Sequence, residues 1–274
     1  VFGSGGTAGS VTVDGLDGVT ATGLTFRPVA GSTPYTLNGR PINLAPGDNL
    51  ISAPNSGATP IIRSTLAGSG QTRNVTFSGS VTLAAGANSY VGSSTVTQTN
   101  LLIGDYNVQR AYTAPFGAPG NALTLNNSTL TGNGSTTGDI ISYELPYNIN
   151  IIGTDTILAG KNFNLGSLSS TLYTVRGDGS LTFNSNLSDA VSSISASFSG
   201  TGPDAFTGTL HVDCYNTRIY SASVGNFLCV PNGTLDLNGT LSPYPTGSPV
   251  TVSFGALAGS GELGDFPPAV THVT

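Results

Sequence analysis

Charged residues are scarce in this sequence. Asp, Glu, Lys and Arg together make up 8% of its 274 residues, whereas an ordinary soluble domain has roughly 25%. Lys161 is the single lysine, the arginines are scattered, and the formal net charge is −6. The chain therefore has no basic stripe of the kind that nucleic-acid-binding proteins use, and we expect no nucleic-acid partner.

Methionine, tryptophan and long apolar runs are also missing. No run approaches the roughly 20 apolar residues of a transmembrane helix, so we expect no membrane insertion. The opening residues, VFGSGG, contain neither an initiator methionine nor a signal-peptide core. This beginning predicts a processed mature segment or an excised fragment.

The spacing of an amphipathic helix is likewise absent, and short runs of alternating residues take its place. Hydrophobic residues make up 38% of the chain and 38 glycines separate the runs, so the chain can bury a core. Examples are SVTVDG (10–15), NVTFSGSVTLAAG (74–86), GSLTFNSN (179–186) and GTLDLNGTLS (233–242). Each run reads as a short strand between turns, which predicts an all-β protein.

The runs share a phrase, [Gly/Ala/Asn]-x-[Leu/Val]-[Thr/Asp]-[Leu/Phe/Val], which recurs about every 20–30 residues, as in solenoids. The word LAGSG also occurs twice, at 66–70 and 257–261. A phosphate-binding loop would need Lys-[Ser/Thr] or a helix after the glycines, and neither follows. We therefore interpret LAGSG as a corner between coils of an elongated parallel β-solenoid.

Residues 79–104, GSVTLAAGANSYVGSSTVTQTNLLIG, resemble the autotransporter-associated β-strand repeat, and residues 179–212 resemble a divergent second copy. The matching positions of the first copy are Gly79, Val81, Leu83, Asn88, Tyr90, Gly92, Val96, Leu101 and Gly104. The resemblance implies a right-handed parallel β-helix on a bacterial cell surface or secreted from the cell. The family's membrane barrel is absent from the sequence.

The predicted architecture is one β-solenoid domain over 11–265. An extended N-terminal segment (1–10) precedes it and an extended tail (266–274) follows. The stretch 105–150 matches the repeat least. The irregular stretch 105–175 holds further coils, a small inserted β-domain or a segment that protrudes from the solenoid.

The two cysteines, Cys214 and Cys229, frame the segment CYNTRIYSASVGNFLC. His211 is the only nearby histidine and no Cys-x-x-Cys occurs, so a zinc site lacks ligands. We predict a disulfide between Cys214 and Cys229; a pair of free thiols is the alternative. A disulfide would indicate an oxidising compartment.

Groups for catalysis are sparse, and we predict no catalytic residue, metal or cofactor. No Gly-x-Ser-x-Gly elbow occurs. The close acid pairs, Asp14 with Asp17 and Glu262 with Asp265, lie in turn-like segments. His211 and Asp213 share one side of a predicted strand, which could orient an imidazole, but a surface pair is the simpler interpretation.

Two segments are candidates for contact with a partner. The tripeptide Arg176-Gly177-Asp178 could form an adhesive turn, although Gly-Asp-Gly before a strand is ordinary turn chemistry. Aromatic residues between 105 and 150 could line a protruding loop that binds a partner or a sugar, although packing in the core is the simpler interpretation for most of these rings. They are Tyr106, Tyr112, Phe116, Tyr143 and Tyr147.

These features predict a non-enzymatic extracellular structural protein. Open coil edges at both ends of a solenoid predict head-to-tail self-assembly into a filament. The first alternative is an adhesin passenger that binds glycans or a host surface through 105–150. The second is a polysaccharide-active β-helix enzyme, which the sparse acids support least.

Overall fold

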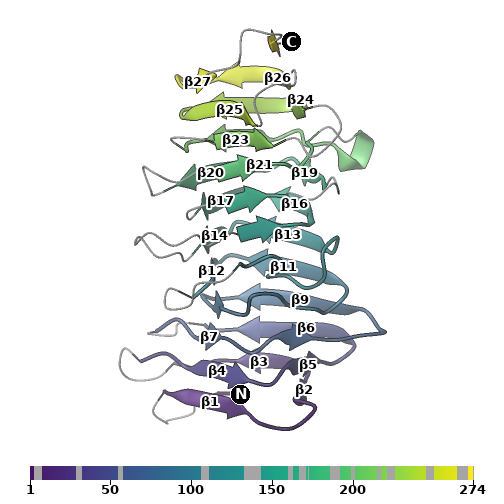
Figure 1. The fold of residues 1–274 in the computed structure, drawn as a ribbon, viewed down its shortest axis with the longest axis vertical. Coiled ribbons are helices and arrows are strands. Elements are labelled where there is room, and N and C mark those ends of the chain that lie inside the picture. The colour runs from purple at the N-terminus through teal and green to yellow at the C-terminus, as the bar shows by residue number, and fades with distance from the viewer. Residues whose placement is uncertain are drawn as a thin grey trace.

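The computed structural model describes most of the chain: residues 1–2, 8–28, 33–54, 58–105, 111–132, 143–159, 163–166, 171, 173–185, 192–198, 201–214, 217–220, 226–244, 250–263 and 271–273. Within them the chain winds into a parallel β-solenoid, which confirms the predicted fold class. Figure 1 shows the coils stacked along one long axis, with the N-terminal coil at one end and the C-terminal strands at the other.

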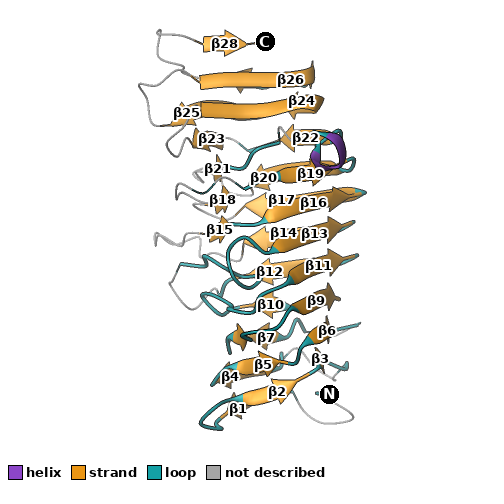
Figure 2. Ribbon diagram, turned by 90° about the vertical axis from the view of Figure 1, so that its right-hand side faces the viewer, coloured by secondary structure: helices purple, strands orange, loops and turns teal. Residues whose placement is uncertain are grey.

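The largest sheet has twelve strands and runs the length of the molecule (Figure 2). Its strands are, in spatial order, β1 (Ser10–Val13), β4 (Thr36–Gly39), β7 (Ile61–Ile62), β10 (Thr82–Leu83), β12 (Asn100–Ile103), β14 (Thr129–Gly132), β17 (Thr154–Ala159), β20 (Ser180–Ser185), β22 (Thr209–Val212), β24 (Asn226–Leu237), β26 (Val250–Ala258) and β28 (Thr271–Val273). Successive strands pair in parallel.

Three smaller sheets complete the coils. The seven-stranded sheet contains β3 (Gly23–Thr25), β6 (Gly47–Ser52), β9 (Arg73–Ser78), β11 (Ser93–Thr97), β13 (Ala122–Asn126), β16 (Asn148–Ile152) and β19 (Val175–Gly177). The six-stranded sheet contains β15 (Tyr143–Leu145), β18 (Phe163–Leu165), β21 (Ser192–Ile194), β23 (Thr217–Tyr220), β25 (Thr240–Tyr244) and β27 (Glu262–Leu263). The three-stranded sheet contains β2 (Val19–Ala21), β5 (Ile42–Leu44) and β8 (Leu66–Ala67), and a 3-10 turn spans Gly202–Asp204.

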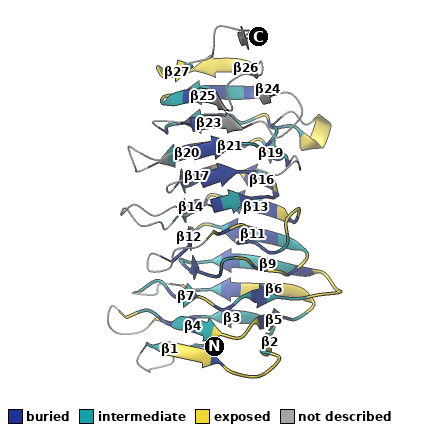
Figure 3. Ribbon diagram, in the orientation of Figure 1, coloured by how far each residue is buried: buried dark blue, intermediate teal, exposed yellow. Residues whose placement is uncertain are grey.

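Side chains along each strand alternate between the inside and the outside of the coil, as the period-two pattern of the sequence predicts. In β9 the alternate residues Val75 and Phe77 are buried, while the residues between them are half-buried on the outer face. In-register pairing then stacks Phe77 on Val96 and Val96 on Leu125. The core is therefore a set of apolar columns along the axis, and Figure 3 shows it buried through the middle coils.

Aromatic rings form two of these interior columns. Tyr112, Tyr143 and Phe163 stack with ring centroids 5.5 and 5.7 Å apart. Phe116 meets Tyr147 edge to face at 5.8 Å. These contacts lie between coils, and aromatic pairs at such distances stabilise a core beyond the apolar area that they bury.

Four glycines form a column along the twelve-stranded sheet. Gly179 and Gly208 directly precede β20 and β22, whereas Gly233 and Gly255 lie inside the long strands β24 and β26. The strand register places the four one above another. A Cβ atom on Gly208 would lie 1.7 Å from the carbonyl oxygen of Gly179. These positions therefore need glycine because two backbones approach closely.

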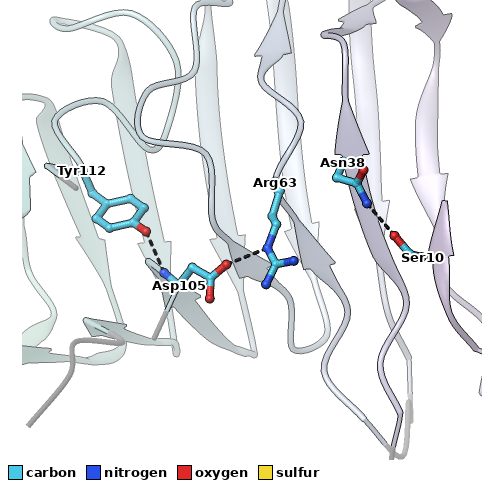
Figure 4. A network of polar contacts seen from close by, with 5 residues as sticks. All are labelled: Ser10, Asn38, Arg63, Asp105 and Tyr112. Carbon is cyan, nitrogen blue, oxygen red and sulfur yellow. Dashed lines mark hydrogen bonds and ion pairs between the residues drawn. The ribbon is translucent and has the colours of Figure 1, made fainter. Parts of the chain in front are cut away.

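Polar side chains also join the coils, both at the surface and in partly buried positions (Figure 4). Asn38 Nδ2 donates to Ser10 Oγ at 2.6 Å. Arg63 Nε donates to Asp105 Oδ2 at 2.6 Å, and the Asp105 backbone N–H donates to the Tyr112 hydroxyl at 2.8 Å. Asp105 is 4% exposed, so the guanidinium of Arg63 neutralises a nearly buried carboxylate.

The two LAGSG words are corners, as predicted, but they occupy different places. In the first, Leu66 is buried in β8 of the three-stranded sheet. In the second, Leu257 lies near the end of β26 in the twelve-stranded sheet and is 51% exposed. In both copies the chain passes from a strand into a turn within LAGSG. The two copies lie in different sheets, so they do not mark a common site.

The predicted terminal segments both contact the solenoid where the structure describes them. Phe2 bridges to Phe26 in parallel, and their rings stack at 5.2 Å. Residues Thr271–Val273 form β28 beside β26. The described part of 105–175 forms coils, with β13 to β19 in the same sheets as their neighbours.

Candidate functional site

The aromatic candidates for a partner loop belong to the core. Tyr112, Phe116 and Tyr147 are fully buried and Tyr143 is 1% exposed. The prediction of a protruding aromatic loop is wrong for these four, because their rings fill the space between coils. Tyr106 lies outside the described residues. Burial also raises the pKa values of Tyr143 and Tyr147 well above the usual tyrosine range.

Cys214 carries a free, buried thiol, so the predicted Cys214–Cys229 disulfide is not formed in the structure. The reason is the register. Thr240 N–H bonds to the Cys214 carbonyl, and a Cβ on Gly239 would touch that carbonyl, so Gly239 lies beside Cys214. Cys229 lies further back in β24, opposite Ser253. Disulfide-bonded residues need Cα atoms within about 7 Å.

The Cys214 thiol should therefore be unreactive until the protein unfolds. Its Sγ is 3.4 Å from the Phe183 carbonyl oxygen, and burial raises its pKa to about 11. We expect an alkylating reagent at pH 8 to modify Cys214 only in denaturant, without any reductant, as read by peptide mass spectrometry. If Cys214 reacts in denaturant only after reduction, the disulfide exists and the register described here is wrong.

Arg176, Gly177 and Asp178 do not form an isolated turn. Arg176 and Gly177 are in β19, and Asp178 follows in an exposed bend. The Arg176 Nη1 atom donates to Asp204 Oδ1 at 2.6 Å. The arginine of the tripeptide is therefore already engaged with a carboxylate of its own chain.

His211 is paired with a different acid from the one expected. Its Nδ1 lies 2.6 Å from Asp236 Oδ2, on the strand of the following coil. The expected partner, Asp213, instead accepts a hydrogen bond from Asn238 Nδ2 at 3.0 Å. Asn238 also reaches Asp236 Oδ1 at 3.4 Å, so the four side chains form one polar cluster on the outer face.

The sequence did contain a signal for the His211–Asp236 pair, because both residues lie at the same position of the repeated phrase. GTLHV (208–212) and GTLDL (233–237) stack in register, and His211 faces Asp236 at the fourth position. Thr182 occupies that position in the preceding coil. Its hydroxyl makes no hydrogen bond to His211, so within the described residues the cluster lacks an activated nucleophile.

The remaining acid pair that the structure describes offers no catalytic geometry either. Asp14 and Asp17 are exposed in the segment between β1 and β2. Glu262 is exposed in β27, and Asp265 is outside the described residues. In the described ranges no group of three or more His, Cys, Asp or Glu side chains could hold a metal ion.

One titratable group in the core was missed by the sequence analysis. Asp155 in β17 is fully buried, and its Oδ1 accepts a hydrogen bond from Ser128 N–H at 2.7 Å. Its Oδ2 is buried without a partner in the described structure. Burial raises the pKa of Asp155 to about 6, although the N–H groups of Ser128 and Ile152 act in the opposite direction.

None of the described segments forms a helix long and apolar enough to cross a bilayer. Comparisons with protein-family models, with curated proteins and with solved structures gave no match for this chain.

Proposed function

We propose that this chain is a non-enzymatic extracellular structural protein whose solenoids stack end to end. The observation that supports it is that each terminal coil exposes an apolar side chain. Val11 in β1 and Leu257 in β26 belong to inward-facing columns, since they pair with the buried residues Leu37 and Leu235. Nevertheless Val11 is 38% exposed and Leu257 is 51% exposed.

The backbone at both ends offers free strand edges in the same sheet. Among the strands that the structure describes, β1 pairs only with β4. β28 covers only Val250–Val252 of β26, so the rest of β26 has no described strand on its outer side. Unpaired edges of this kind add a further strand readily. A second copy that placed β1 against β26 would continue the sheet and cover both side chains.

End-to-end stacking is a heterologous contact, which repeats without closing and produces fibres. Complete burial of one exposed Leu or Val side chain contributes about 1.5–3 kcal/mol. Val11 and Leu257 are already partly covered, so the strand ladder would have to supply much of the free energy that offsets the cost of association. The extracellular location rests on the resemblance to autotransporter repeats and on the low charge.

We expect Leu257→Asp and Val11→Asp to abolish assembly, because each places a carboxylate in the proposed contact. The matched control is Leu50→Asp. Leu50 is 49% exposed but points outward from the side of the solenoid in β6. Electron microscopy and analytical ultracentrifugation of the concentrated protein would show fibres for the unchanged chain and the control. A chain that stays monomeric at its solubility limit contradicts the proposal.

A further inference from the structure

Asparagine is followed by glycine at four places in the sequence, where the asparagines are Asn38, Asn133, Asn232 and Asn238. The backbone nitrogen of the next residue can attack an asparagine side chain, and glycine favours the attack because it has no side chain to crowd the ring that forms. Asn133 lies outside the described residues. The structure places the other three asparagines in different surroundings, which should protect them to different degrees.

Asn38 is held by hydrogen bonds between the first two coils. Its Nδ2 donates to Ser10 Oγ at 2.6 Å, and its Oδ1 accepts from Thr12 Oγ1 at 3.3 Å. The glycine that follows, Gly39, is paired with Val13 in the ladder between β1 and β4. Both the side chain and the backbone of this Asn-Gly pair are therefore restrained.

Asn238 is restrained in a similar way near the other end of the solenoid. Its Nδ2 donates to Asp213 Oδ1 at 3.0 Å and reaches Asp236 Oδ1 at 3.4 Å. The N–H of the following Gly239 donates to the Val212 carbonyl oxygen at 2.9 Å. Here the nitrogen that would attack is already engaged, so this pair should also be protected.

Asn232 has neither restraint. It is exposed, and its side chain makes no hydrogen bond to any residue that the structure describes. The register between β24 and β26 shifts between Val230 and Thr234, which leaves residues 231–233 opposite Gly255 alone. This is a β-bulge, in which the extra residues of one strand are left out of the ladder.

We propose that Asn232 is a site of spontaneous deamidation, which converts it to aspartate and isoaspartate. The Gly233 nitrogen loses its proton and attacks Cγ of Asn232. The bond between Cγ and Nδ2 then breaks, and the side-chain nitrogen leaves as ammonia. Water opens the resulting succinimide ring at either carbonyl, which gives aspartate or isoaspartate. Gly233 is buried, but Asn232 carries the carbon that is attacked and is open to water.

The bulge allows the reaction and also determines its consequence. The attack requires Asn232 to rotate out of the extended backbone conformation, which a residue outside the ladder can do most easily. Isoaspartate lengthens the backbone by one carbon atom beside Gly233, where a Cβ would lie 2.5 Å from the Gly208 carbonyl oxygen. Figure 1 shows β24 next to β26 at the C-terminal end. This end of the solenoid is therefore the part that should change first as the protein ages.

The experiment incubates the full-length chain in a mildly alkaline buffer and measures the acid form of each asparagine by peptide mass spectrometry. We expect Asn232 to convert at least about tenfold faster than Asn38 and Asn238 in the folded protein, which corresponds to about 1.4 kcal/mol in the activation free energy. In denaturant the three rates should become similar, because the attacking residue is glycine in each case.

Two variants provide an independent measurement by ion-exchange chromatography. Asn232→Gln should prevent the slow appearance of the more acidic form, because glutamine would have to form a larger ring. The matched control, Asn38→Gln, should leave that appearance unchanged. If Asn38 or Asn238 converts as fast as Asn232 in the folded chain, the proposal is wrong. It is equally wrong if Asn232 stays intact in the folded chain while all three convert in denaturant.

Discussion

Gly208→Ala is expected to lower the free energy of unfolding by about 3 kcal/mol, at the upper end of overpacking effects. The added Cβ would lie 1.7 Å from the Gly179 carbonyl oxygen and 2.8 Å from its carbon. Both atoms belong to the backbone of the preceding coil, which is fixed by the ladder between β20 and β22. No flexible side chain can move aside, so two coils must separate at this corner.

The matched control is Gly9→Ala. Nothing lies within 4 Å of a Cβ at Gly9, and its backbone angle is not in the left-handed region. We expect a change within about 0.5 kcal/mol for this control. Denaturant unfolding followed by circular dichroism compares the two variants. Equal midpoints would mean that the coils can separate at Gly208 without loss of stability.

Asp155→Asn is expected to stabilise the protein at pH 7 by about 1–3 kcal/mol, since one pKa unit corresponds to about 1.4 kcal/mol. The pKa of Asp155 in the folded protein, about 6, is above the usual aspartate value of 3.8. The charged form is thus disfavoured in the folded state. The asparagine keeps an oxygen to accept the Ser128 N–H but carries no charge, and its buried amide N–H groups offset part of the gain.

The sign of the pH dependence follows from the same shift. Above pH 6 the folded protein holds a buried carboxylate, which is destabilising. As the pH falls from about 7 to about 4, the folded state takes up a proton before the unfolded state does, so the contribution of Asp155 to stability improves. Below the unfolded pKa both states are protonated and the contribution no longer changes.

We therefore expect the stability difference between Asp155→Asn and the unchanged chain to shrink steadily from pH 7 to pH 4. Asp178→Asn, which changes an exposed acid, is the control and should show no such trend. Unfolding free energies at several pH values test this directly. If Asp155→Asn is less stable than the unchanged chain at pH 7, the carboxylate has a partner that favours its charge.

The recurring phrase predicted the fold because it encodes the stacking itself. GSLTF (179–183), GTLHV (208–212) and GTLDL (233–237) lie in register, with Leu181, Leu210 and Leu235 in one buried column. Some corners of the coils have a left-handed backbone, such as Gly153, with a φ of 77°. Gly208 is different: it is needed for close approach of two coils, which no local pattern reveals.

The candidate site residues were predicted less well, because chain neighbours are not spatial neighbours in a solenoid. The spacing of Cys214 and Cys229 suggested a bridge, but the coil register brings Gly239 beside Cys214. The poor match of 105–175 to the repeat suggested a protruding loop, whereas the rings of Tyr112 and Tyr147 are buried between coils. Asp213 is close to His211 in sequence, yet Asp236 is its partner across the coil boundary.

The register also determines how the chain can acquire its structure. Ser180 pairs with Thr209, and Thr209 pairs with Thr234, so the partner of each strand is the segment made one coil earlier. Interactions between nearest neighbours let folding begin in one place and propagate. A chain that emerges from a pore or a ribosome with its N-terminus first can therefore fold progressively, with each completed coil serving as the template for the next.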